Sequence, residues 1–195
     1  MTESSRLIFD GDYPMAHTAL DLNRDLLLPI DAMRGSPQTH QVASRTDAET
    51  LATIPEMRRG GVAGALVKVV GRIFRDDDRN PAGYRTGEIA YAAAQSHLAY
   101  YRILERRGAA RLLCSGADVA DHFATWESAT DFDELPIGMV IGMEGADSIL
   151  WPEMVHEWWD DGLRVISLSH YGKSVYCHGT GTGTDGGLFP PARQL

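Results

Sequence analysis

The chain has 195 residues, of which 44% are hydrophobic and 23% charged, and its formal net charge is -9 at pH 7. This composition is typical of a globular protein with a substantial core, and the acidic charge without a basic face argues against a nucleic-acid partner. From the polar N-terminus we expect no signal peptide, and since no apolar run reaches the length of a membrane span we expect no transmembrane segment. Because Cys114 and Cys177 lack metal-ligand or disulfide spacing, we expect a cytoplasmic protein.

Strands and helices alternate along the predicted chain. A polar connection follows the first strand, and a charged loop occupies residues 74–85. The tail after residue 170 has no periodicity and is predicted to be a loop. Strands are predicted at residues 6–9, 62–70, 110–116, 137–145 and 163–170. Helices are predicted at residues 53–59, 86–107, 117–128 and 152–162.

The clearest helix signals lie in the middle of the chain. Thr53 is a candidate N-cap with proline in the first turn, and Gly60 with Gly61 ends that helix. Between residues 86 and 107, apolar side chains recur at helical spacing on one stripe. The alternation predicts an α/β fold with parallel strands and helical crossovers. This alternation fits either an open doubly wound sheet or part of a (β/α)8 barrel. Both folds place their catalytic and binding residues at the carboxyl ends of the strands.

Polar side chains follow several of these strands. Asp10 and Asp12 follow the first strand, Glu144 ends the fourth, and His170 ends the fifth. Carboxylates with a histidine are suitable ligands for a divalent cation. Turn, capping and surface roles are the alternative for each residue alone. Glu144 is the exception, because a carboxylate between Gly142 and Gly145 at the end of a buried strand is costly unless it is paired.

Other polar residues are weaker candidates. His17 and Asp21 lie four residues apart after the first strand and could reach the same edge. Lys68 lies within the second strand, where a Schiff-base role has little support, and Ser115 lacks the context of a nucleophile elbow. Packing or surface roles are expected for His122 and His156. The tryptophan pair, Trp158 and Trp159, is expected to cover the core, with one ring partly exposed.

Four stretches, taken in order, resemble the membrane dipeptidase (renal dipeptidase) family of zinc metallopeptidases, peptidase family M19. Their order and spacing carry the resemblance, which spans nearly the whole chain, and the ending GLFPPARQL is similar to a family segment after the fifth strand. The four stretches are FDGD, MRRGGVAGAL, GMEGAD and GLRVISLSHYG.

The resemblance implies a (β/α)8 TIM-barrel fold with one or two zinc ions at the carboxyl ends of the strands. A metal-bound hydroxide would attack the peptide bond of a dipeptide. Glu144 matches the family's bridging metal ligand, and His170 matches the histidine that contacts substrate and polarises its carbonyl group. Glu144 and His170 are thus the predicted catalytic residues, and Glu144 and Asp12 the predicted metal ligands.

Two departures from the family pattern affect the expected site. The family's H-x-D pair of zinc ligands is replaced by Asp12 and Pro14, and proline cannot bind metal. The family's further zinc-binding histidines belong to strands six and seven, which this sequence does not reach. We therefore expect a single partial barrel domain over residues 1–195, with weak or absent metal binding and two free sheet edges. Such a chain would be a truncated product or would need a homo-oligomer or a complementing C-terminal half.

Three functional hypotheses follow. The first is a zinc-dependent, dipeptidase-like hydrolase that cleaves dipeptides or similar small amides. The second is a non-catalytic descendant of the same fold that binds a small ligand or a partner, and the loss of the H-x-D pair supports it. The third is an unrelated parallel α/β enzyme with an open sheet.

Overall fold

The computed structural model describes residues 6–34, 52–75, 83–184 and 186–195. Its contacts divide the described residues into two compact units, the first within residues 1–67 and 100–140 and the second within residues 68–99 and 141–195. Parts of the predicted polar connection after the first strand and of the loop 74–85 lie outside the described residues. No helix in the described ranges has the length and apolar character that a membrane crossing requires.

All the strand pairs with a defined register are parallel, as the alternating pattern predicts. The order β1-β2-β4-β3 places β4 between β2 and β3, whereas successive strands of a (β/α)8 barrel pair in chain order. β5 pairs with the second half of β4. The α/β class and the incomplete set of parallel strands are therefore confirmed. The strands are β1 (Ile8–Tyr13), β2 (Val62–Val70), β3 (Ala110–Leu112), β4 (Ile137–Glu144) and β5 (Leu163–Ser167).

Six α-helices lie within the described residues. Four were predicted, and the helix expected over 152–162 is divided into a short 3-10 turn, Pro152–Met154, followed by α6. The other two lie where a polar connection was predicted. Met15, Ala16 and Ala19 bury one side of the first of them, which is too short for its periodicity to be conspicuous. The helices are α1 (Met15–Leu20), α2 (Ile30–Arg34), α3 (Ile54–Arg59), α4 (Gly87–Arg106), α5 (Gly116–Ser128) and α6 (Val155–Asp160).

The first unit has its core where α5 packs on the amino-terminal parts of the strands. Trp126 is 1% exposed, donates a hydrogen bond from its indole nitrogen to the carbonyl oxygen of Pro136 at 3.0 Å, and contacts the ring of Phe132. His122 is also buried in this core. At Gly138 a Cβ atom would lie 2.7 Å from the imidazole of His122, so only glycine fits beside that ring.

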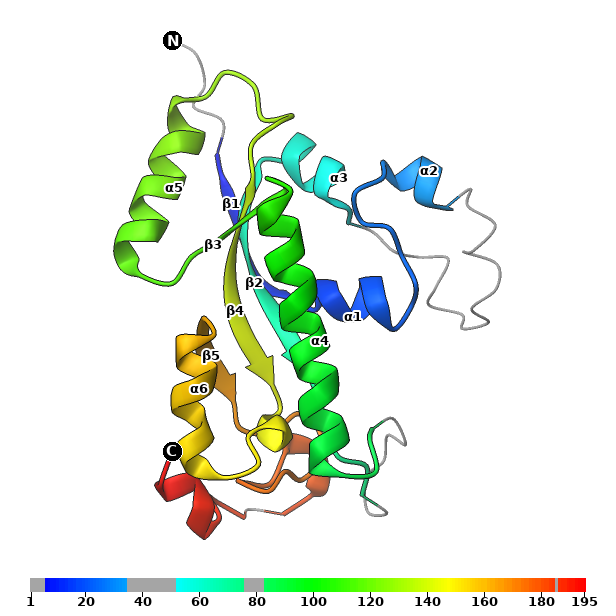
Figure 1. The fold of residues 1–195 in the computed structure, drawn as a ribbon, viewed down its shortest axis with the longest axis vertical. Helices are drawn as coiled ribbons and strands as arrows, with labels where there is room; N and C mark the ends of the chain where they lie inside the picture. The colour runs from blue at the N-terminus through cyan, green and yellow to red at the C-terminus, as the bar shows by residue number, and fades with distance from the viewer. Residues whose placement is uncertain (1–5, 35–51, 76–82, 185) are drawn as a thin grey trace. The chain divides into compact units, whose positions relative to one another are not determined.

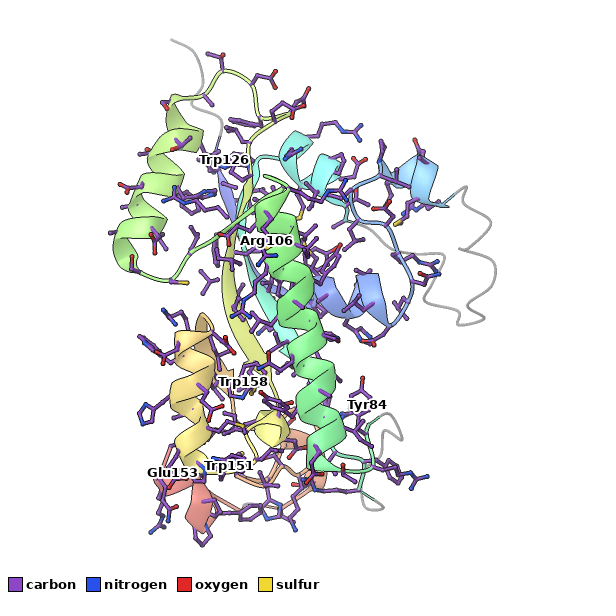
Figure 2. All side chains as sticks on the ribbon, viewed as in Figure 1. Tyr84, Arg106, Trp126, Trp151, Glu153 and Trp158 are labelled. Atoms are coloured by element: carbon purple, nitrogen blue, oxygen red, sulfur yellow. The ribbon has the colours of Figure 1, made fainter. Side chains whose placement is uncertain are left out.

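The second unit has its own core. Trp158 of α6 (Figure 2) is 1% exposed. Its ring meets that of Tyr91 of α4 edge-on, with 5.7 Å between centroids. α6 lies alongside β5 (Figure 1). Trp159 is 56% exposed and stacks on the guanidinium of Arg164, so the expectation that one ring of the tryptophan pair is partly exposed is confirmed.

Candidate functional site

Glu144 is the last residue of β4, next to Ser167 at the end of β5. The strand before it is buried, but the Glu144 side chain is 23% exposed, so the carboxylate emerges at the carboxyl end of the sheet. Gly145 follows with φ of 83°, a conformation that favours glycine. The nitrogen of Gly145 donates to the carbonyl oxygen of Ser167 at 3.1 Å, which holds the chain beyond β4 against the chain beyond β5.

His170 lies on the segment that follows β5 and reaches back to Glu144. Its Nε2 atom is 2.6 Å from Oε1 of Glu144, and its side chain is 30% exposed. Its ring also meets the ring of Tyr171 edge-on, with centroids 4.9 Å apart. The two predicted catalytic residues are therefore in direct contact within one unit, at the carboxyl ends of adjacent strands.

Arg72 completes a chain of three side chains and was not among the predicted site residues. It lies two residues after the end of β2, and its Nη1 atom donates a hydrogen bond to Nδ1 of His170 at 3.2 Å. The signal was available in the sequence, since the rule that selected Glu144 and His170 at strand ends also selects Arg72. It was overlooked because a carboxylate or an imidazole suggests metal binding and a guanidinium does not.

Asp147 anchors the turn that follows Glu144. Its side chain is 1% exposed, and it accepts two hydrogen bonds from Arg75, each 2.9 Å long. The backbone nitrogens of Ile73 and Val175 each donate to the same carboxylate at 3.0 Å. Arg75 also donates to the carbonyl oxygen of Lys173 at 2.6 Å. One buried ion pair thus fastens the segment after β2, the turn after β4 and the loop after His170 to one another.

Asp12 lies in the first unit, inside β1 rather than after it. The register between β1 and β2 shifts between Asp10 and Tyr13, so Asp12 occupies an irregular part of the strand. Its backbone nitrogen donates to Oδ1 of Asp10 at 3.0 Å. Because Asp12 belongs to one compact unit and Glu144 and His170 belong to the other, the expected convergence of all three stays a prediction.

The weaker candidates mostly have local structural roles. His17 and Asp21 pair with each other, with 2.6 Å between Nδ1 and the carboxylate, and both are largely exposed. Ser115 is the N-cap of α5, where its hydroxyl accepts a hydrogen bond from the nitrogen of Asp118. The Asp118 carboxylate accepts from that hydroxyl and from the Cys114 nitrogen, and these bonds lower its pKa.

Two buried titratable side chains act in packing. His122 lies 2.8 Å from the carbonyl oxygen of Ala63, and burial lowers the pKa of its imidazole. Tyr176 donates to the carbonyl oxygen of Ile149 at 2.6 Å, and burial, with Asp147 and Glu153, raises its pKa to about 12. Both side chains are therefore neutral at physiological pH, as packing residues should be.

The donor set does not fit a conventional catalytic zinc site. Such a site has three protein ligands and a water molecule. Within the described residues, no group of three or more histidine, cysteine, aspartate or glutamate side chains is placed to hold a metal. Glu144 is instead paired with His170, and the side chain of Pro14, at the N-cap of α1, has no atom that can bind a metal.

Comparison with known proteins finds likeness in structure and not in sequence. No family model matches the sequence, and no curated protein matches it. Dipeptidase AC, a metallopeptidase of family M19, matches with a TM-score of 0.67 and 20% identity, over 98% of this chain and 52% of its own. The probable dipeptidase PvdM from Pseudomonas aeruginosa matches with a TM-score of 0.56 and 15% identity, over 88% of this chain and 36% of its own.

The chain thus shares the fold of solved dipeptidases and spans about half the length of the first of them. The resemblance to family M19 that rests on four short sequence stretches is matched by this structural likeness over nearly the whole chain. At these identities the likeness shows the fold, and the reaction must be argued from the side chains.

Proposed function

We propose that this protein is a dipeptidase-like hydrolase that acts on dipeptides or similar small amides. The observation that carries the proposal is the contact between Glu144 and His170 at the carboxyl ends of β4 and β5, where α/β folds place their chemistry. The fold likeness to dipeptidase AC supports the reaction class. The contact also supports the roles that the family resemblance gave to these two residues.

The two side chains have complementary capacities. A carboxylate such as Glu144 accepts a proton from a water molecule that attacks the amide carbon. An imidazole N–H of His170 donates a hydrogen bond to the carbonyl oxygen as negative charge develops on it. Both side chains are half-buried, so they are shielded from bulk water while remaining accessible to a small substrate.

Zinc is the cofactor that the family resemblance implies. Glu144 and Asp12 are the residues proposed to bind it, and two ligands are fewer than a catalytic zinc ordinarily has. The roles of Glu144 and His170 given above are accordingly stated without the metal. Zinc dependence is a separate question for experiment.

A second function of another class has its own support. Within the described residues, Glu144 belongs to no group of three side chains that could hold a metal, and its carboxylate is already paired with His170. A protein that binds a small dipeptide-like ligand at this site without cleaving it would retain the contact between Glu144 and His170 and would need no metal. Stoichiometric zinc in the purified protein would speak against this alternative.

Dipeptide hydrolysis and binding, measured on the same preparations, distinguish the two functions. We expect wild type to hydrolyse simple dipeptides and Glu144→Gln to lose about 100-fold in kcat/KM. Glu153→Gln is the matched control, because Glu153 is exposed (Figure 2), and it should behave as wild type. Each protein is assayed with and without added zinc. Equal rates for wild type and Glu144→Gln reject the assignment, and calorimetric binding without hydrolysis supports the non-catalytic alternative.

A further inference from the structure

Arg72 bonds to the ring nitrogen of His170 that Glu144 does not contact. Its Nη1 atom lies 3.2 Å from Nδ1 of the imidazole, and the opposite nitrogen, Nε2, lies 2.6 Å from Oε1 of Glu144. The imidazole is therefore held between a guanidinium and a carboxylate. The two partners differ in what they can do, because a guanidinium only donates hydrogen bonds and an ionised carboxylate only accepts them.

This arrangement determines where the hydrogen of a neutral imidazole lies. Arg72 can bond to Nδ1 only if that nitrogen presents its lone pair. Glu144 can bond to Nε2 only if that nitrogen carries the hydrogen. Both bonds form together in the tautomer with hydrogen on Nε2, whereas the other tautomer places two N–H groups against each other and leaves a lone pair facing the carboxylate.

The backbone on both sides of Arg72 is fixed, so the guanidinium is presented from a rigid segment. The carbonyl oxygen of Gly71 accepts from the hydroxyl of Ser148 at 3.0 Å, and a Cβ atom at Gly71 would lie 2.2 Å from a backbone oxygen of Ala90. The nitrogen of Ile73 is bonded to Asp147. Ser148 and Asp147 belong to the turn directly after Glu144, so the segment that presents Arg72 is tied to the strand end that presents the carboxylate.

We infer that Arg72 is a positioning residue that holds His170 in the tautomer with hydrogen on Nε2, the nitrogen that faces Glu144. The catalytic consequence rests on the proposed function, because that hydrogen is the one His170 offers to a substrate carbonyl oxygen. The tautomer itself doesn't depend on any reaction. Arg72 needs no contact with substrate for this role, since it acts through the imidazole.

Nitrogen-15 NMR of the full chain tests the inference directly. In histidine-labelled protein at a slightly alkaline pH, the signals of His170 are assigned from their loss in His170→Gln. We expect Nε2 of wild type to be of the protonated, pyrrole type and Nδ1 to be of the unprotonated, pyridine type. Because Glu144 by itself also favours hydrogen on Nε2, the role of Arg72 is tested in a Glu144→Gln background, where the side-chain amide can either donate or accept. Glu144→Gln should keep the wild-type pattern, adding Arg72→Met should give a mixture of both tautomers, and adding Arg72→Lys instead, which retains a donor, should keep the pattern. Arg85→Met, at an exposed arginine of the same unit, is the control.

The outcomes separate this inference from the proposed function. Hydrogen on Nδ1 in wild type, protonation of both nitrogens, or the same pattern in Glu144→Gln with and without Arg72→Met would each overturn the role of Arg72. If wild type also hydrolyses dipeptides, Arg72→Met alone should lower kcat roughly tenfold or more, with recovery in Arg72→Lys, because Glu144 then engages the attacking water and leaves Arg72 to hold the tautomer. If none of them hydrolyses a dipeptide while the tautomer responds as expected, the proposed function fails and the positioning role stands.

Discussion

Arg75 and Asp147 form a bidentate ion pair, in which two guanidinium nitrogens donate to the two carboxylate oxygens at 2.9 Å each. The carboxylate is 1% exposed and the guanidinium side chain 19% exposed. Paired and fully hydrogen bonded, such a carboxylate is tolerated in a protein interior. Without its cation it becomes an uncompensated buried charge.

The first prediction follows from this pair. We expect Arg75→Met to lower the free energy of unfolding by about 3 kcal/mol, because Asp147 keeps its backbone donors but loses its counter-charge. Arg106→Met is the matched control at an exposed arginine (Figure 2), expected to change stability by less than about 0.5 kcal/mol. Urea denaturation followed by circular dichroism measures both. Similar stabilities for the two variants would contradict the structural role given to the pair.

The second prediction concerns Gly71, the residue before Arg72. A Cβ atom there would meet a backbone oxygen of Ala90 at 2.2 Å and the hydroxyl of Ser148 at 2.3 Å. We expect Gly71→Ala to destabilise the protein by about 3 kcal/mol, since the backbone atom cannot move aside cheaply. At Gly116, the first residue of α5, a Cβ atom meets nothing within 4 Å, so Gly116→Ala should be neutral or stabilising by up to about 1 kcal/mol. Thermal unfolding of both variants checks the contrast.

The third prediction is a pH dependence that His122 contributes. Burial lowers the pKa of its imidazole, so the unfolded chain binds a proton at pH values where the folded unit does not. The stability that the neutral His122 contributes is fully present above the pKa of the unfolded chain, about 6.5, and is lost as the pH falls through the lower pKa of the folded state.

Two histidine variants test that contribution. The difference between the free energies of unfolding at pH 8 and at pH 5.5 should be smaller in His122→Gln than in wild type. His156→Gln, which removes an exposed histidine, should retain the wild-type difference. An undiminished difference in His122→Gln would show that the acid sensitivity arises elsewhere.

The fourth prediction concerns the sheet edges. Among the described strands, β1 pairs only with β2 and β5 only with β4, and Ile8, Phe9 and Val165 on these two strands are 48%, 43% and 41% exposed. We expect amide hydrogens of β4 to exchange most slowly and those of β1 and β5 to exchange faster. If β1 and β5 are as protected as β4 in the purified protein, a partner or a second copy covers them, which size-exclusion chromatography would reveal.

The regular elements were predictable because their signals are local. The apolar run at residues 62–70 coincides with β2, and the stripe between residues 86 and 107 differs from α4 by one residue at each end. Thr53 is the N-cap of α3 as expected, although its side chain makes no capping hydrogen bond. α1 and α2 were missed because helices of six and five residues complete too few turns for a period to stand out.

The candidate site was predictable only in part. Glu144 and His170 were identified because each ends a strand, and their contact could be inferred from the parallel order of β4 and β5. Asp147 was missed because its role depends on long-range pairing, and Arg72, although it stands near a strand end, was passed over because its partner could not be read from the sequence. Asp147 binds Arg75, 72 positions earlier in the chain, and Arg72 binds His170, 98 positions later. No local pattern reports such pairings, and the three partners of Asp147 look like ordinary loop residues until the fold is known.

The Asp147 network also has a bearing on the order in which the polypeptide can mature on the ribosome. Arg75 and Asp147 are translated well before Val175, whose backbone nitrogen supplies the fourth donor to that carboxylate. Until residues 173–175 leave the exit tunnel, the Asp147 carboxylate lacks one of its four donors, and Arg75 lacks its bond to the carbonyl oxygen of Lys173. The loop after His170 is then not yet attached to the turn after Glu144. The end of the sheet that carries Glu144 and His170 should therefore become protease-resistant only after residues 173–175 have emerged.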